Sequence, residues 1–113
     1  MNPEEVIQRQ VIAYNTRNIN DFVDCHHPDV ELYNFQEKTP FAIGKEKVRN
    51  IYSEVFDRSP ELHTEVIHRM VLGKTVIDNE IVTGRAGVDS LKIIAVYTVE
   101  EDLIVRADFI REG

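Results

Sequence analysis

The stretch HRMVLGKTVIDNEIVTG, residues 68–84, predicts a β-hairpin, because two runs of alternating residues flank a two-residue turn. Gly73 takes the first central position of this turn, which suits a type II′ geometry. The resulting register places Arg69 opposite Asp78, where the two side chains can form a cross-strand ion pair. The stretch therefore predicts an antiparallel sheet whose register can be checked by one charge pair.

The same alternation continues over the C-terminal half of the chain and predicts four antiparallel strands: residues 62–72, 75–84, 90–99 and 103–110. If residues 100–102 form the last loop, three pairs lie on one apolar face: Tyr97 with Val105, Ala95 with Ala107 and Ile93 with Phe109. That face should meet the helices, and it gathers Leu62, Val66, Met70, Ile77, Ile81, Leu91, Ile93, Ala95, Tyr97, Leu103, Val105, Ala107 and Phe109.

The opposite face of the sheet is mixed in character. It carries Ile67, Val71, Ile94, Val96, Ile104 and Ile110 together with Arg69, Asp78, Glu80, Arg106 and Asp108. One interpretation is a half-exposed sheet with scattered isoleucines, and the other is a surface covered by a second copy of the chain. Because isologous dimers are the commonest assembly, we expect a homodimer through this outer sheet face.

Three helices are predicted before these strands. Asn2, Pro3 and Glu5 form a capping pattern for a helix that ends near Asn15. Its buried stripe should carry Val6, Ile7, Gln10, Val11, Ala13 and Tyr14. A short second helix should follow Asn18 and stop at Pro28, a strand should cover residues 29–35, and a third helix should run from Gly44 to Ser59. The order predicts a single α+β domain over residues 1–113.

Composition and charge narrow the class of protein. The 113 residues have a formal net charge of −7, so we expect no nucleic acid and no anionic membrane as a partner. No apolar run approaches the ~20 residues that span a bilayer, and the N-terminus lacks a signal peptide pattern. Cys25 is the one cysteine, so no internal disulfide can form. We expect a cytoplasmic protein.

Three segments together resemble a known family: AYNTRNINDFVDCHHPDVELYNF (13–35), GKEKVRNIYSEVF (44–56) and residues 68–84. They are similar to the SnoaL-like branch of the nuclear transport factor 2-like superfamily, which also contains ketosteroid isomerases. The resemblance implies a cone-shaped α+β barrel, in which a strongly bent sheet wraps helices around a blind apolar pocket, often in a dimer. Members include isomerases, dehydratases, cyclases, hydrolases and binding domains, so the resemblance implies fold more than function.

The steroid isomerase site does not carry over to this sequence. The resemblance places Gln10 where the isomerases have the oxyanion-hole Tyr, Asn34 where they have the Asp base, and Ala95 where they have a protonated Asp. An amide cannot abstract a proton and an alanine cannot donate one, which argues against steroid isomerisation by that mechanism. We expect Asn34 to be a hydrogen-bonding residue of an apolar pocket, where an Asp would have a raised pKa.

His68 is the residue best suited to act as a general base, because it titrates near neutral pH and its side chain is predicted to face inward opposite Asn79. The alternative is a neutral core histidine that Asn79 satisfies. No metal site is expected, because His63 and His68 lie on opposite strand faces and His26 and His27 are adjacent. No cofactor motif is present either.

The sequence is thus interpreted as a small-molecule-binding domain. The expected ligand is small and apolar or partly polar, held by Gln10, Tyr14, Phe22, Asn34, Phe35, Phe41, Tyr52, Phe56, Asn79, Tyr97 and Phe109. The first alternative is a lyase, isomerase or hydrolase with His68 as base. The second is a dimeric interaction module with a vestigial pocket.

Overall fold

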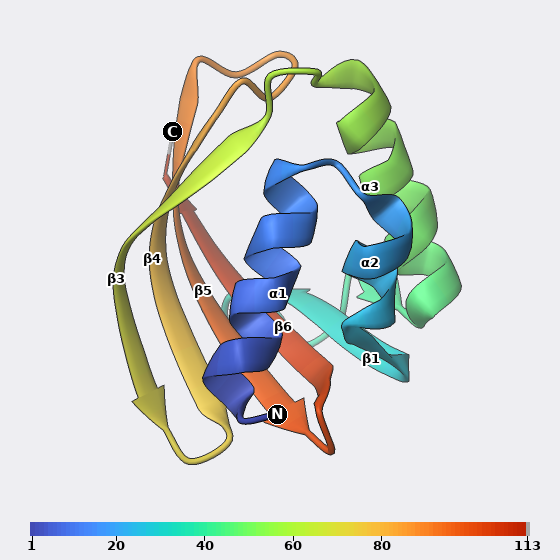
Figure 1. Cartoon of the computed structure of the whole chain (residues 1–113), viewed down its shortest axis with the longest axis vertical. Coiled ribbons are helices and arrows are strands. Elements are labelled where there is room, and N and C mark those ends of the chain that lie inside the picture. Colours follow the sequence, from blue (N-terminus) through green and yellow to red (C-terminus); the bar gives the residue numbers. More distant parts are fainter. Residues whose placement is uncertain (113) are drawn as a thin grey trace.

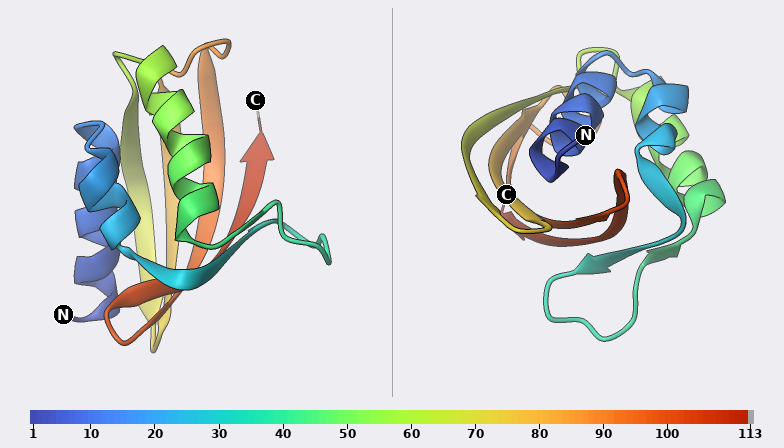
Figure 2. Two further views of the ribbon diagram at one scale, coloured as in Figure 1. Left: turned by 90° about the vertical axis from the view of Figure 1, so that its right-hand side faces the viewer. Right: turned by 60° about the horizontal axis from the view of Figure 1, so that its bottom comes forward.

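A six-stranded sheet curls around the N-terminal helix in the computed structural model, which describes residues 1–112 (Figures 1 and 2). The elements are α1 Pro3–Asn15, α2 Ile19–Asp24, β1 His26–Asn34, β2 Ala42–Ile43, α3 Lys45–Arg58, β3 His63–Leu72, β4 Thr75–Thr83, β5 Ser90–Glu100 and β6 Leu103–Glu112. The strand order is β2-β1-β6-β5-β4-β3, and only β1 and β6 run parallel. Figure 2 shows β3 to β6 wrapping one side of α1 while α2 and α3 close the other. The predicted α+β cone is confirmed.

The first helix, α1, has the N-terminal cap and the buried face that the sequence predicts. Asn2 Oδ1 accepts a hydrogen bond from the Glu5 backbone at 2.8 Å, and the Glu5 carboxylate accepts one from the Asn2 backbone at 3.1 Å, which completes a capping box. The buried residues of α1 are the six that the sequence predicts: Val6, Ile7, Gln10, Val11, Ala13 and Tyr14. No helix within residues 1–112 is long and apolar enough to span a membrane.

The second helix ends earlier than predicted, at Asp24, and β1 begins at His26. Pro28 therefore lies inside a strand rather than at the end of a helix. The pairing of β1 with β6 is irregular between His26 and Glu31, so the missing N–H of Pro28 removes no ladder hydrogen bond. His26 faces the interior, where its Nδ1 donates a hydrogen bond to the Phe22 carbonyl at 2.8 Å.

The β3–β4 hairpin has the predicted register, with Arg69 opposite Asp78. Of the two turn residues only Gly73 has a positive φ, +57°, as the first central position of a type II′ turn requires. A bulge between Val66 and His68 then changes the register by one residue, because Ile67 has no partner on β4. The bulge increases the bend of β3 around α1.

The faces of β4 are reversed relative to the prediction. Val76, Asp78, Glu80 and Val82 are buried on the inner face, whereas Ile77 and Ile81 lie on the outer face. The reason is visible in the pairing with β5: Asp78 lies opposite Ala95 and Glu80 opposite Ile93, and residues directly opposite each other share a face. The predicted ion pair therefore forms, but inside the cone.

The β5–β6 register also differs from the prediction. Ala95 pairs with Phe109 and Tyr97 with Ala107, two residues further along β6 than expected. The turn contains only Glu101 and Asp102. The register then changes between the pairs Val99–Ile104 and Thr98–Arg106, so Val105 is the extra residue of a bulge. The bulge turns Ile104 inward, where it is fully buried, although the sequence pattern placed it outside.

Gly84 follows β4 and lies close to the Glu61 backbone, and its conformation leads to a testable prediction. It has a φ of +73°, and a Cβ there would lie 2.1 Å from the Glu61 carbonyl oxygen. We expect Gly84→Ala to lower the free energy of unfolding by about 3 kcal/mol or more, measured by urea unfolding. Gly87→Ala is the matched control, because Gly87 has a φ of +85° but open space around it. It should lose only about 1–2 kcal/mol from backbone strain; equal losses would contradict the close approach at Gly84.

Candidate functional site

A small cavity of about 40 Å³ opens between the helices and the sheet near the end of the cone that carries the β4–β5 loop. It is lined by Gln10, Tyr14, Tyr52, Thr64, Glu80, Val82, Arg85, Ile93, Tyr97, Phe109 and Arg111. These residues come from α1, α3, β3, β4, β5, β6 and the loop after β4, so the cavity exists only in the assembled fold. Its volume admits only a few water-sized groups.

Glu80 is the central polar group of this cavity. Its side chain is only 7% exposed, and its Oε1 accepts a hydrogen bond from the Thr64 hydroxyl at 3.1 Å. Its Oε2 is buried and has no hydrogen-bond partner within residues 1–112. Burial raises the pKa of Glu80 to about 7, with a further rise from the neighbouring Asp78 charge. The carboxyl group can therefore hold or release a proton near neutral pH.

Asp78 lies two residues from Glu80 on the same strand face and is fully buried. Arg69 binds it through both guanidinium nitrogens, with Nε–Oδ1 at 2.6 Å and Nη2–Oδ2 at 2.9 Å. The remaining Nη1 of Arg69 donates to the Gln8 side-chain oxygen at 3.0 Å. This bidentate pair compensates the buried charge of Asp78, which leaves Glu80 as the inner carboxylate without a cationic hydrogen-bond donor.

Asn15 fixes the position of Thr64. The Thr64 backbone N–H donates to Asn15 Oδ1 at 2.7 Å, and Asn15 Nδ2 donates to the Thr64 carbonyl at 3.1 Å. These two bonds attach the C-terminal end of α1 to the start of β3. They hold the Thr64 hydroxyl where it can donate to Glu80, so the orientation of the carboxylate is set by α1 as well as by the sheet.

Three tyrosines from three elements line the cavity around Glu80. Burial raises the pKa of Tyr14, Tyr52 and Tyr97, and the Glu80 charge adds to the rise in each case. Their hydroxyl groups thus stay protonated at neutral pH and can donate hydrogen bonds. An oxygen atom of a ligand in this cavity would meet neutral donors and one titratable carboxyl group.

Two arginines also line the cavity. Arg111 donates a hydrogen bond to the Asn34 side-chain oxygen, and its guanidinium carbon lies 5.0 Å from the Phe109 ring centre and 5.6 Å from that of Phe41. The Arg85 side chain forms no hydrogen bond or ion pair with any of residues 1–112. Both guanidinium groups act on Tyr14 and Tyr52 by lowering their pKa values, against the larger effect of burial.

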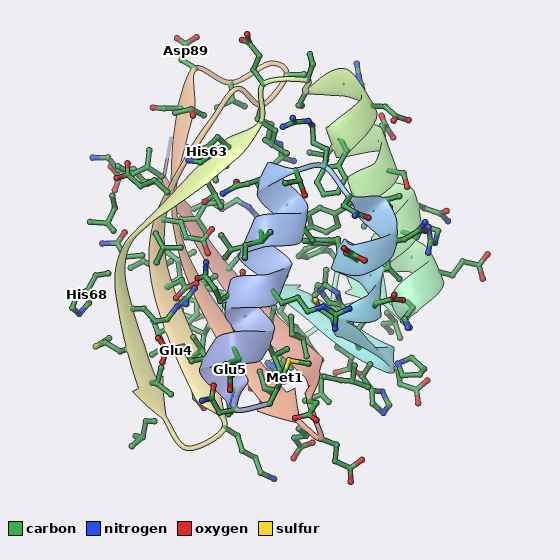
Figure 3. All side chains as sticks on the ribbon, in the orientation of Figure 1. Met1, Glu4, Glu5, His63, His68 and Asp89 are labelled. Carbon is green, nitrogen blue, oxygen red and sulfur yellow. The ribbon has the colours of Figure 1, made fainter. Side chains whose placement is uncertain are left out.

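The inward placement predicted for His68 and Asn79 is wrong. They do lie opposite each other, but both are exposed on the outer face, and Figure 3 shows the His68 side chain pointing away from the helices. The cause is the same error of strand face that placed Glu80 outside. His68 cannot reach the cavity and cannot serve as a base there.

The other predicted pocket residues divide into three groups. Gln10, Tyr14, Tyr52, Tyr97 and Phe109 line the cavity, although their binding role stays a prediction. Phe22 and Phe56 do not line it, since their rings pack against each other at 5.5 Å and against Tyr14 and Tyr52. Asn34 and Phe41 do not line it but contact residues that do: Asn34 accepts a hydrogen bond from Arg111, and the Phe41 ring lies 6.2 Å from that of Phe109. Phe35 is 47% exposed.

The sequence reasoning missed Thr64, Glu80, Arg85 and Arg111. The sequence did contain one signal for Glu80: Asp78 and Glu80 are two residues apart, so both carboxyl groups lie on the same face of the strand. The arginines gave no such signal, since a loop and a strand end have no periodicity. Within residues 1–112 no group of three metal-ligating side chains converges to hold an ion.

Comparisons with known proteins support the fold. A family model described as the SnoaL-like domain matches residues 7–107. An uncharacterised cystatin-fold protein from Novosphingobium aromaticivorans superposes with a TM-score of 0.90 at 27% identity, covering 98% of this chain and 99% of that chain. A protein of the nuclear transport factor 2-like fold from Cytophaga hutchinsonii gives 0.83 at 12% identity over 99% and 91% of the chains. A protein from Sinorhizobium meliloti proposed to be a polyketide cyclase gives 0.80 at 13% identity over 94% of each chain. No curated protein matched the sequence.

Asn34 allows a test of the charge at this site. An Asp at this position was expected to have a raised pKa, but the guanidinium of Arg111 binds the Asn34 oxygen, so Asn34→Asp should have a depressed pKa instead. We expect a gain of about 0.5 kcal/mol in the free energy of unfolding at pH 7. The gain should be lost as the pH falls through the depressed pKa, because the protonated acid no longer pairs with Arg111.

The measurement is urea unfolding of both proteins at pH 7 and pH 3. In an Arg111→Gln background the gain should vanish, which makes this double variant the control. A loss of stability at pH 7 that is recovered in acid would contradict the contact.

Proposed function

As a member of the SnoaL-like domain family, this protein holds its cavity inside a curled sheet, and we propose that the cavity takes the polar end of a small molecule and exchanges a proton with it through Glu80, while the rest of the molecule lies in the groove of about 370 Å³ that Arg85 also lines. The observation that carries the proposal is the buried Oε2 of Glu80, a residue that lines the cavity, because no group within residues 1–112 forms a hydrogen bond with this oxygen. Unpaired buried carboxylate oxygens are rare because they cost free energy. A ligand hydroxyl or acidic C–H would supply the missing partner.

The protonation of Glu80 suits this role. A general acid or base works best when its pKa lies near the ambient pH, and the pKa of Glu80 is about 7. The Thr64 hydroxyl at 3.1 Å fixes one carboxylate oxygen and leaves the other directed at the ligand. Asp78 cannot share the role, because Arg69 occupies both of its oxygens.

The tyrosines provide the second half of the chemistry. When a base removes a proton next to a carbonyl group, negative charge develops on the carbonyl oxygen. Tyr14, Tyr52 and Tyr97 remain neutral and present hydroxyl donors to the same cavity as Glu80. This arrangement favours proton transfer between Glu80 and a carbon or oxygen atom next to a carbonyl group of the ligand. The ligand would then be released either unchanged or as an isomer.

The alternative is a protein that binds the molecule without catalysis. The structural comparisons do not favour either role, because similarity below 25% identity supports the fold alone. The two roles differ in whether the wild-type protein accelerates the exchange of ketone α-protons with D₂O. We expect cyclopentanone to exchange faster with wild-type protein than with Glu80→Gln. If the ketone binds but its α-protons exchange at the same rate with both proteins, the protein binds the ketone without catalysis by Glu80.

The pH dependence of stability tests the state of Glu80. The folded pKa of about 7 exceeds the ordinary value of 4.5, so the folded state holds a proton that the unfolded chain releases, and stability falls as pH rises between these values. The fall is worth about 3 kcal/mol. Buried His26 acts in the opposite direction, because burial lowers its pKa to about 4, and stability rises with pH between 4 and 6.5.

We therefore expect the wild-type free energy of unfolding to be nearly flat from pH 4.5 to 6.5, because the two effects cancel. Glu80→Gln should expose the histidine effect alone, as stability that rises over this range. Urea unfolding at half-unit pH steps measures both curves. Parallel curves for wild type and Glu80→Gln would contradict a raised pKa at Glu80.

We also propose a homodimer through the outer sheet face. Ile67, Met70, Ile94 and Ile110 are exposed there, and together with half-buried Ile77 and Val96 they form the outer apolar patch. The pairing of β3 to β6 places these side chains on neighbouring strands. A twofold axis through the patch would bury the same side chains of two copies.

Sedimentation equilibrium tests this assembly. We expect a dimer for the wild type and a monomer for Ile94→Glu, because the introduced carboxylate would be buried without a partner at the twofold contact. Ile43→Glu, on the edge strand β2 and outside the outer apolar patch, should remain dimeric. A monomeric wild type at millimolar concentration would reject the dimer.

A further inference from the structure

Two positively charged groups border the candidate cavity in a chain with a net charge of −7. Arg85 lies in the loop after β4, and Arg111 lies near the end of β6. Within residues 1–112 neither guanidinium forms an ion pair with a carboxylate. The only side-chain hydrogen bond of Arg111 within residues 1–112 goes to a neutral amide.

Three arginines elsewhere in the fold pair with acidic side chains. Arg58 binds Glu54 at 3.0 Å, Arg69 binds Asp78 at 2.6 Å and Arg106 binds Asp108 at 3.0 Å. Arg9, Arg17 and Arg49 also form no ion pair within residues 1–112, so what distinguishes Arg85 and Arg111 is that both line one cavity. Their charge attracts anions to a cavity that otherwise contains carboxylates.

We infer that the cavity takes a ligand bearing a carboxylate, held between Arg85 and Arg111, with its hydrogen-bonding end directed at Glu80. This inference rests on the proposed function for the site and adds the class of ligand. A guanidinium presents a planar fork of N–H donors that matches a carboxylate in a bidentate way. A dianionic phosphate would suit the site less well, because Asp78 and Glu80 lie close behind the cavity.

The surroundings of Arg85 leave room for the rest of such a ligand. Arg85 also lines an adjoining groove of about 370 Å³ between the end of α3 and the β4–β5 loop. Ile51 and Val55 provide apolar surface in that groove, and Glu54 there is already paired with Arg58. A carboxylate on Arg85 would therefore lie at the junction of a small polar cavity and a larger, partly apolar groove.

Binding of an anion should be coupled to the protonation of Glu80. The charged or titratable groups that interact with Glu80 or line the same cavity come from every element packed around it: Tyr14, Tyr52, Arg69, Asp78, Arg85, Tyr97 and Arg111. A carboxylate added to this set repels the ionised form of Glu80, so the complex should take up a proton. Affinity should then weaken by about tenfold between pH 6 and pH 8.

The test uses three probes of equal size that differ in charge: butanoate, butanamide and butylammonium. Dissociation constants are measured by ¹H–¹⁵N NMR titration of the full chain at constant ionic strength. We expect butanoate to bind at least about tenfold more tightly than either of the other probes at pH 6. Arg85→Gln and Arg111→Gln should each weaken butanoate by about tenfold. The matched control is Arg106→Gln, which removes the same charge from the outer face of β6 and should leave affinity unchanged.

Equal affinities for butanoate and butanamide, or an unchanged affinity in both cavity variants, would overturn the inference. Tighter binding of inorganic phosphate than of butanoate would overturn the choice of a carboxylate. Glu80→Gln should bind butanoate with no change between pH 6 and pH 8. If its pH dependence matches that of the wild type while Arg85→Gln still loses binding, the carboxylate site stands and the proposed role of Glu80 fails.

Discussion

The interior of this cone depends on the bidentate ion pair between Arg69 and Asp78. Asp78 is fully buried, and an uncompensated carboxylate at that position would destabilise the fold by several kcal/mol. Arg69 supplies two hydrogen bonds from the neighbouring strand, so β3 and β4 are joined by charge as well as by backbone pairing. Burial is the main cause of the raised pKa of Glu80, and the Asp78 charge on the same strand face raises it further, whereas Arg69 acts in the opposite direction. The structural ion pair thus influences the chemistry of the cavity.

The helix caps at Asn2 and Asn18, the approximate bounds of β3 to β6 and the β3–β4 register could be predicted because they depend on neighbouring residues, such as the capping box at Asn2 and the turn at Gly73. The faces of β4 could not. Aliphatic residues occur on both faces of that strand, with Val76 and Val82 on one and Ile77 and Ile81 on the other, so hydrophobicity alone does not choose between them. The choice is made by pairing with β5 and by the compensation of Asp78, and both are contacts between distant parts of the chain.

The candidate site was predictable in the same uneven way. The residues on α1 and α3 and the inward positions of β5 and β6 were found from periodicity, and five of them line the cavity. The predicted apolar walls were wrong in part, because aromatic side chains pack on one another: the rings of Phe22 and Tyr52 lie 4.6 Å apart and those of Tyr14 and Phe56 lie 5.7 Å apart. This aromatic core fills the space that a larger apolar pocket would need.

Because aromatic side chains fill much of the interior, the remaining cavity is lined in part by residues from a loop and a strand end. Arg85 belongs to the loop after β4, and Arg111 lies near the end of β6. Glu80 and its supports, Thr64 and Asn15, belong to the paired strands and to α1, and hydrogen bonds hold them in place. The two arginines lie outside that network and are bound to no acidic residue within residues 1–112. A substitution at either arginine changes the charge presented to a ligand without disturbing the bonds that orient Glu80. The group proposed to exchange a proton and the groups proposed to select the ligand are therefore separable, because the paired strands hold Glu80 while a loop and a strand end carry the two arginines.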